Sequence, residues 1–150
     1  MNRRWDSVQA WRNRQRDEAS IEVGKARQAI QTIDDQIEKL HNEIQNTVIA
    51  SSARTGSVSV DRLLGEGRYR FQIEAQIGDL RETRARLESE LERRREILLA
   101  SQFEVKRIER LAEKQKSEDD LKRRQRELAE TDEAAARTHL IRTRTQNIQR

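Results

Sequence analysis

The sequence contains no cysteine and no proline, and only five glycines and five aromatic residues among 150 positions. Without cysteine the chain can form no disulfide, no cysteine-ligated zinc site and no thiol nucleophile. The absence of proline removes the strongest helix breaker and argues against a disordered linker, which is usually rich in proline. No run of about 18 apolar residues is present, so we expect no membrane span. Residues 1–6 also lack the apolar stretch of a secretory signal.

Charged residues make up 39% of the chain, hydrophobic residues make up 33%, and the formal net charge is +4. An ordinary globular domain contains about 45–50% apolar residues, so this chain cannot fill a broad core. Arg, Glu, Gln, Leu and Ala, which favour helices, make up more than half of the chain. The composition therefore predicts a soluble, intracellular and extended protein built from long helices.

The apolar residues of the first half are alternately three and four residues apart, which is the heptad spacing of a coiled coil. Extended towards the N-terminus, this frame passes Ala19 and is then expected to fail at Arg16 and Arg12. Trp5 and Trp11 are expected to follow a shifted phase. The residues of this predicted seam are Val23, Ala26, Ile30, Ile33, Ile37, Leu40 and Ile44.

A small, polar, glycine-containing segment at residues 51–60 separates the two halves and predicts a turn. Ser59 can cap the following helix, and Asp61 then lies in its first turn, where a negative charge suits the helix dipole. Gly65 and Gly67 weaken this start, so the helix could instead begin near Arg68.

The second half continues the heptad spacing over five heptads, interrupted at Arg84, Arg94 and Ser101. An arginine at such a position can cover the core with its aliphatic stem while its charged end stays in water. The seam is expected to lapse after Leu111 and to resume in a different phase at Leu121, Leu128 and Ala135. Its main residues are Ile73, Ile77, Leu80, Leu87, Leu91, Leu98, Val105 and Ile108.

These patterns predict an all-α fold in which two long helices form an antiparallel coiled-coil hairpin. The single domain of residues 1–150 would consist of a helix at about 5–50, a turn at about 51–60 and a helix at about 61–145. Folding about residues 55–56 would place Trp11 near Leu99–Phe103. Trp5 and Trp11 either cover the open end against Phe103 or belong to an interface with a partner. The second helix is the longer one, so about 40 residues beyond Lys106 would overhang without a partner.

No group of residues predicts chemistry. His41 and His139 are nearly 100 positions apart, and adjacent carboxylates such as Asp34 and Asp35 point in different directions on a helix. The Gly65–Gly67 segment lacks the strand, third glycine and lysine of a phosphate-binding loop. We therefore expect no catalytic residue, no cofactor and no metal, and do not expect an enzyme.

The charge is concentrated at the two ends of the chain. Residues 1–16 hold five arginines against one aspartate, and residues 134–150 hold four arginines and no acid, so each end carries +4. Such ends could bind nucleic acid or anionic lipid. However, no basic stripe follows a helix and no aromatics interleave for base stacking, so solvated or acid-pairing ends are favoured.

The segment from Leu98 to Leu111 resembles the FliJ family of flagellar export proteins, with a Leu-Ala step, a Glu and a Lys, and then an acid and a Leu. The Asp132-Glu133 pair after the charged run, and Tyr69 followed by Ile73 and Ile77, are also similar to this family. The resemblance covers nearly the whole chain and is most specific over residues 69–137. It implies a non-enzymatic, cytoplasmic stalk protein, peripheral at the inner face of the cell membrane.

The resemblance also implies the partners: the hexameric export ATPase and its regulator, the membrane export-gate platform protein, and export chaperones. No small-molecule substrate is implied, and nucleic acid is disfavoured. By position, the gate-binding residues at the tip would be Tyr69, Ile73, Gln76 and Leu80, although Ile73 and Leu80 also belong to the seam. We expect the helix ends to contact the ATPase ring through Arg3, Arg4, Trp5, Trp11, Arg12, Leu121, Leu128 and Arg137.

Three other functions remain open from the sequence. The equivalent stalk of a virulence type III secretion system has the same architecture. The chain could also be a structural coiled-coil protein that self-assembles through its C-terminal stripe. A basic hairpin that binds nucleic acid is the third.

Overall fold

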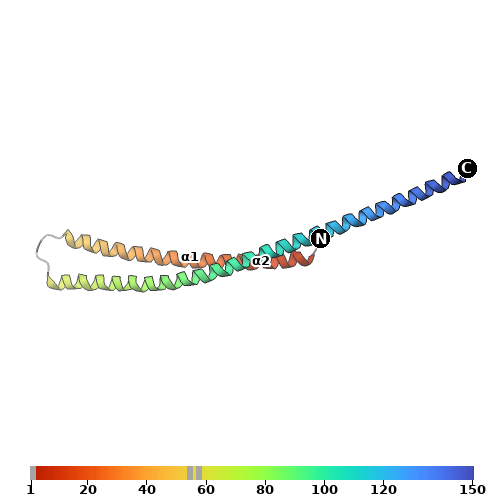
Figure 1. Ribbon diagram of the computed structural model, residues 1–150. Helices are drawn as coiled ribbons and strands as arrows, with labels where there is room; N and C mark the ends of the chain where they lie inside the picture. The colour runs from red at the N-terminus through yellow and green to blue at the C-terminus, as the bar shows by residue number, and fades with distance from the viewer. Residues whose placement is uncertain (1–2, 54–55, 57–58) are drawn as a thin grey trace. The chain divides into compact units, whose positions relative to one another are not determined.

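The computed structural model describes residues 3–53, 56 and 59–150, and it consists of two long helices. Helix α1 comprises Arg3–Ser52, and helix α2 comprises Val60–Ile148. The helices run antiparallel on either side of the turn (Figure 1). The all-α hairpin with a longer second helix is therefore confirmed, and both helix ranges agree with the sequence to within a few residues.

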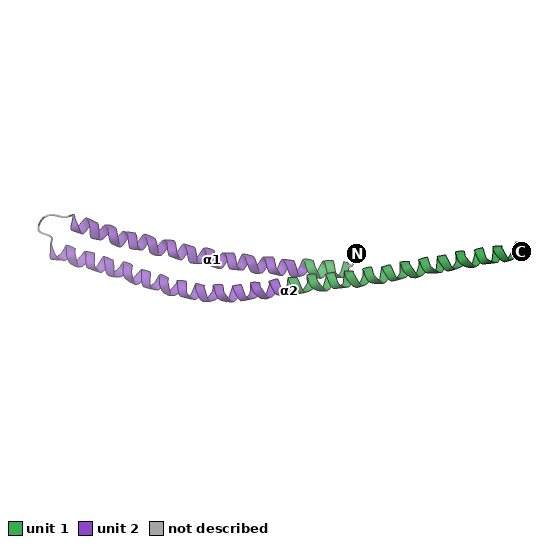
Figure 2. Cartoon of the chain, turned by 45° about the horizontal axis from the view of Figure 1, so that its top comes forward, with its two compact units in different colours: residues 1–10, 104–150 green, residues 11–103 purple. Residues whose placement is uncertain are grey.

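The chain divides into two compact units, shown in Figure 2. Unit 1 contains residues 1–10 and 104–150, and unit 2 contains residues 11–103. Each unit combines a piece of α1 with a piece of α2. The assignment of residues 1–150 to a single domain remains a prediction.

Local capping decides where α2 begins. The backbone N–H of Arg62 donates to the Ser59 hydroxyl at 3.3 Å and to the Ser59 carbonyl at 3.1 Å, so Ser59 caps the helix as predicted. Asp61 lies in the first turn. The alternative start near Arg68 is wrong, because this cap holds the helix from Val60 onward despite two glycines.

The turn between the helices needs glycine at one described position. Gly56 has φ of 138°, a conformation that L side chains rarely adopt. Before it, the N–H of Ala53 donates to the carbonyl of Ile49 at 3.0 Å and closes the last turn of α1. Residues 54–55 and 57–58 of the predicted turn lie outside the described part of the chain.

The core of unit 2 is a narrow seam between the helices, as the heptad spacing predicted. Val23, Ala26 and Leu91 form a buried cluster, against which Ile30 and Leu98 pack. The seam also holds Ile73 and Ile77 near the turn and Ala19 towards the open end; these three side chains are at most 8% exposed.

The first-helix frame does not fail at its arginines, contrary to the expectation. Arg12 and Arg16 are half-buried at the positions that the spacing assigns to the seam, while Trp11 is 47% exposed. The aliphatic stem of an arginine can take a seam position, and this avoids a change of phase. The predicted phase shift of Trp11 is therefore wrong.

The register of the hairpin also differs from the prediction. Asp34 faces Arg84, Glu22 faces Arg94 and Ser51 faces Glu66, so each partner lies about six positions further along α2 than folding about residues 55–56 implies. The reason is an asymmetric turn. The hydroxyl of Ser51, the last seam residue of α1, donates to Glu66, six positions after the start of α2, so the first turns of α2 precede the paired region.

In unit 1, the start of α1 lies against the middle of α2. Trp5, Val8 and Gln9 are half-buried, and on α2 Val105 is 4% exposed. The seam continues at positions 108, 112 and 115, whereas Leu111 is exposed. All α2 residues from position 121 onward are exposed. The uncovered part of α2 is therefore about 30 residues long and begins near Leu121, later than the predicted start near Lys106.

Candidate functional site

A shallow groove crosses unit 2 where α1 and α2 lie side by side, and we call it the hairpin groove. Leu40 and Leu80 are its apolar residues, and both are half-buried in the seam. Polar and charged side chains border them, so a ligand would contact an apolar centre with a polar rim. The groove is lined by Gln36, Lys39, Leu40, Glu43, Gln76, Asp79 and Leu80.

The structure places the four residues predicted to bind at the tip in different environments. Gln76 is exposed and lines the hairpin groove together with Leu80. Tyr69 is 46% exposed, and its hydroxyl reaches Glu43, another groove residue. Ile73 is only 3% exposed because it packs in the seam. Tyr69, Gln76 and Leu80 therefore contact or line one surface, and Ile73 supports it from inside.

Tyr69 and Glu43 form a hydrogen bond that joins the two helices beside the groove. The Tyr69 hydroxyl donates to Glu43 Oε2 at 3.3 Å. The negative charge of Glu43 raises the pKa of Tyr69 above its ordinary value, with partial burial and the hydrogen bond acting in the same direction. The raised pKa means that this contact stabilises the hairpin below pH 10, and that its contribution is lost as pH rises through the pKa of the folded state.

Because Tyr69 is the chain's only tyrosine, its ionisation can be followed directly by ultraviolet absorbance. We expect the pKa of Tyr69 to exceed 10.0, and the variant Glu43→Gln to lower it towards that value. The variant Glu38→Gln, which changes another exposed glutamate of α1, serves as the control. Equal tyrosine pKa values in the wild type and in Glu43→Gln would show that the carboxylate does not act on the phenol.

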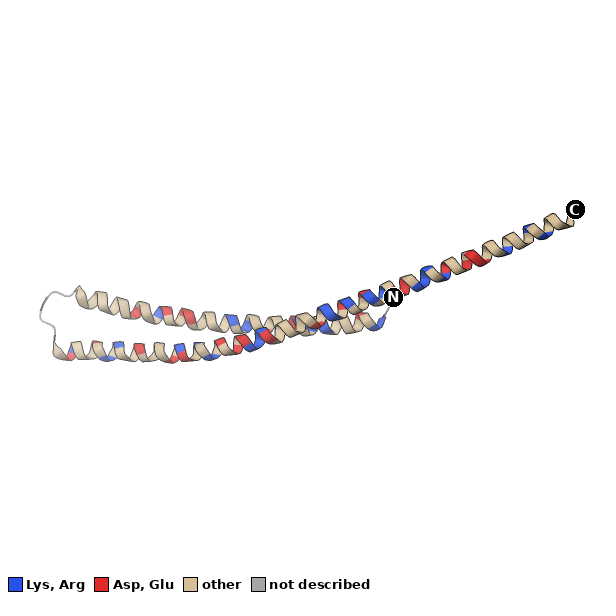
Figure 3. Ribbon diagram, viewed as in Figure 1, with Lys and Arg blue, Asp and Glu red and all other residues tan. Residues whose placement is uncertain are grey.

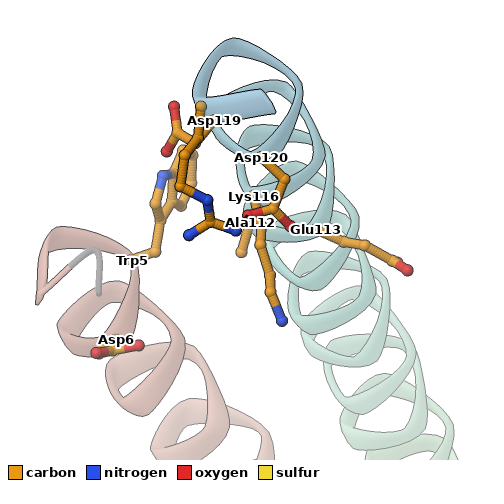
Figure 4. A pocket seen from close by; sticks show the side chains of 8 residues that line it. Trp5, Asp6, Ala112, Glu113, Lys116, Asp119 and Asp120 are labelled. Carbon is orange, nitrogen blue, oxygen red and sulfur yellow. Dashed lines mark hydrogen bonds and ion pairs between the residues drawn. The ribbon is translucent and has the colours of Figure 1, made fainter. Parts of the chain in front are cut away.

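A second candidate surface lies in unit 1, where Trp5 projects from α1 towards α2 (Figure 4). Its indole faces the side chains of Lys116, Asp119 and Asp120 across an open pocket. Within this pocket, Arg123 Nη2 pairs with Asp120 Oδ1 at 2.8 Å. Trp5 is half-buried in this pocket. In unit 2, Trp11 and Phe103 are 47% and 64% exposed, so the prediction that Trp11 covers the open end against Phe103 is wrong.

The other residues predicted to contact the ATPase ring are divided between the two units. In unit 1, Arg3 and Arg4 are exposed on α1, and Leu121 and Leu128 are 56% and 64% exposed on α2. Arg137 pairs with Glu133 at 3.6 Å, but both side chains are more than two-thirds exposed. An exposed pair of this kind contributes little stability, so Arg137 can exchange its partner.

Trp11 and Arg12 belong to unit 2 and lie against each other. The Arg12 guanidinium lies 4.7 Å from the centroid of the Trp11 ring, within the range of a cation–π contact. Arg12 is half-buried and also donates to Gln15 Oε1 at 3.3 Å. Trp11 therefore presents an exposed aromatic face whose orientation is held by its neighbour.

The distribution of charge agrees with the pattern in the sequence (Figure 3). Acidic and basic residues alternate along most of α2, and many pair within the helix at distances from 2.7 to 3.8 Å. The last part of α2 carries Arg142 and Arg144 with no acid after Glu133. Its basic end is thus available to an acidic partner.

The α1 side of the hairpin groove was not identified from the sequence. Gln36, Lys39 and Glu43 are ordinary polar residues on the exposed side of a heptad pattern, and the predicted register placed Lys39 and Glu43 opposite earlier parts of α2 than the groove residues. The seam arginines Arg84 and Arg94 carried the missing signal. Pairing them with Asp34 and Glu22 corresponds to the observed register, but the sequence alone does not choose these partners.

Within the described part of the chain, no cluster of His, Asp and Glu has the arrangement of a metal site. Neither helix, over its described residues, is apolar enough along its length to cross a membrane. The surfaces found are an open groove, an open pocket and exposed helix ends, which are suited to contacts with other proteins.

Comparison with known proteins supports the resemblance seen in the sequence. The family model described as "Flagellar FliJ protein" matches residues 1–144 of the chain. Searches of curated proteins and of solved structures found no match. Proteins of the matched family are non-enzymatic components of the flagellar export apparatus. The matched range includes both helices and almost all of the chain, so this protein belongs to the FliJ family and is a component of the flagellar export apparatus.

Proposed function

We propose that the protein is a stalk that binds the export ATPase ring through its helix ends and the membrane export-gate protein through the hairpin groove. The observation that carries this proposal is the state of α2 from Leu121 onward, where every residue is exposed and the end is basic. A long helix with exposed leucines and no covering α1 residues needs a partner to bury them.

An acidic, partly apolar ring bore fits this surface. Leu121 and Leu128 supply apolar contacts one heptad apart, and four arginines after Ala134 supply positive charge without any acid. Arginine makes up 25 of the 31 basic residues, and its planar guanidinium can bind carboxylates through two hydrogen bonds. Trp5, Arg3 and Arg4 belong to the same unit and extend the surface to the start of α1.

For the gate protein, the hairpin groove offers an apolar centre between Leu40 and Leu80, with Gln76 and Tyr69 available for polar contacts. Ile73 takes part only by holding α2 against α1, because it is buried. Contacts with the regulator of the ATPase and with export chaperones are part of the same proposal, and they rest on membership of the family.

The groove is tested by a substitution that leaves the seam intact. We expect Gln76→Arg to weaken binding of the gate protein's cytoplasmic domain by about ten-fold, since a bulky charge would cover the apolar centre. Isothermal titration calorimetry measures this affinity. Gln102→Arg makes the same change at an exposed position of α2 away from the groove and should bind normally. If Gln76→Arg and Gln102→Arg bound the gate protein's cytoplasmic domain with equal affinity, the groove would not be its binding site.

Self-assembly through the exposed leucines of α2 is the competing function. The stalk proposal expects a largely monomeric chain in sedimentation velocity at micromolar concentration, because the apolar residues at heptad spacing are divided between two short frames, Leu121, Leu128 and Ala135 in one and Ala134, Ile141 and Ile148 in the other. A concentration-dependent dimer that is abolished by Leu121→Ser/Leu128→Ser would instead support the structural coiled-coil function.

A further inference from the structure

Two arginines occupy seam positions in the middle of unit 2, where a coiled coil normally places aliphatic residues. Arg84 Nε donates to Asp34 Oδ1 at 2.6 Å, and its Nη2 lies 3.5 Å from Asp34 Oδ2. Arg94 Nη1 donates to the backbone carbonyl of Glu22 at 3.0 Å and lies 3.6 Å from the Glu22 carboxylate. Each arginine therefore reaches from α2 to its own partner on α1, Arg84 to Asp34 and Arg94 to Glu22.

The aliphatic part of the seam does not by itself select this register. The apolar residues recur every seven positions, so sliding α2 by one heptad would pair aliphatic residues again. Ile37 would face Ile73, Ile33 would face Ile77, and Ile30 would face Leu80 instead of Leu87. This slipped register is also the one expected from the midpoint of the turn.

The two arginines distinguish the registers. In the slipped register Arg84 would lie between Lys25 and Arg27, and Arg94 would lie opposite Arg16. Arg84 would lose its acceptor on α1 and meet two like charges, and Arg94 would meet Arg16, which already pairs with the nearby Asp17 at 3.1 Å; both changes disfavour that pairing. We infer that Arg84 and Arg94 are positioning residues that select a single register of the hairpin, through Asp34 and the backbone at Glu22.

The hairpin groove depends on this selection. Leu40 and Gln36 line the groove with Gln76 and Leu80 only in the observed register. Sliding by one heptad moves α2 by roughly 10 Å and would bring Arg70 to Leu40. The biological use of the register rests on the proposed function, because it assumes that the groove binds the gate protein. The selection of the register by Arg84 and Arg94 does not depend on that assumption.

The experiment measures the register directly in the full chain. The natural sequence has no cysteine, so Asn42→Cys and Ser89→Cys provide two unique sites for spin labels on exposed positions of α1 and α2. In the observed register Ser89 lies about 14 residues beyond the position opposite Asn42, and in the slipped register about 21, which is roughly 10 Å further along the axis. Double electron–electron resonance measures the distance between the two spin labels and therefore distinguishes the two registers.

We expect Arg84→Leu/Arg94→Leu to show both distances, whereas the wild type shows only the shorter one. The variant should keep or raise its melting temperature, because leucine suits the seam and a polar seam residue fixes register at a cost in stability. The matched control is Arg86→Leu/Arg93→Leu, which removes the same charge from positions that are 77% and 71% exposed, and it should show the shorter distance alone.

A single short distance in Arg84→Leu/Arg94→Leu would overturn the inference, whatever its melting temperature. The milder pair Arg84→Gln/Arg94→Gln removes the charges without adding apolar surface and should also populate the longer distance; if it does not, the inference fails in the same way. Gate binding is measured separately. A gate protein that binds wild type and all variants equally, with the two distances present in the leucine variant, would contradict the groove proposal and leave the register selection intact.

Discussion

Removal of residues 127–150 is expected to abolish stimulation of the export ATPase while leaving the melting temperature of the hairpin unchanged. The deleted part of α2 is exposed throughout, so its loss removes no seam contact. The truncated chain keeps Asp120 and Arg123, and therefore the pocket beside Trp5. It loses Leu128 and Arg137 together with the basic end. ATP hydrolysis by the purified ATPase, with and without the chain, measures the effect, and circular dichroism measures stability.

A finer test of the same surface compares two pairs of exposed apolar residues on α2. We expect Leu121→Ala/Leu128→Ala to reduce ATPase stimulation by about ten-fold, because exposed apolar residues at the centre of an interface carry much of its binding energy. Ile97→Ala/Leu99→Ala changes residues that are similarly exposed, at 60% and 54%, but belong to unit 2. Full stimulation of ATP hydrolysis by the chain that lacks residues 127–150 would show that the ATPase binds outside this part of α2.

Replacing Ile73 by alanine is expected to destabilise the protein by about 3 kcal/mol, whereas the same replacement of Phe71 should change stability by less than about 0.5 kcal/mol. Ile73 is 3% exposed in the seam, and Phe71, two positions away with a larger side chain, is 73% exposed. Truncating a buried aliphatic side chain leaves a cavity, and truncating an exposed ring leaves none. Chemical denaturation followed by circular dichroism gives both values.

Equal effects of the two substitutions would contradict the packing of α2 against α1 in unit 2. The comparison also bears on the gate contact. We expect Ile73→Ala to weaken gate binding in proportion to the loss of folded hairpin, so that binding recovers at lower temperature. A residue in direct contact with the gate protein would lose affinity at every temperature.

The fold was predictable because it depends on features that are local in the sequence. Heptad spacing from Val23 to Ile44 and from Ile73 to Ile108 marks one apolar side on each helix, and the polar segment before Ser59 marks the turn. The cap at Ser59 was found from a single residue type at a helix start. The predicted range of each helix consequently agrees with the structure.

The candidate site was predictable only in part. Tyr69, Gln76 and Leu80 were identified by resemblance to a family, and they do line or adjoin one groove. Their α1 neighbours were missed because exposed polar residues such as Lys39 and Glu43 carry no signal of their own. Arg12 and Arg16 were misread as the end of the seam, because a pattern of residue types does not show how an arginine stem packs.

The sequence by itself determined that this protein is a pair of long helices with one narrow seam, a basic end on each helix and membership of the FliJ family. Only the tertiary structure decided the register, and with it the hairpin groove and the place near Leu121 where α2 becomes uncovered. The physical reason is that a heptad repeat is satisfied equally by pairings seven residues apart. The choice between them depends on contacts across the hairpin, such as Arg84 with Asp34, that join residues 50 positions apart.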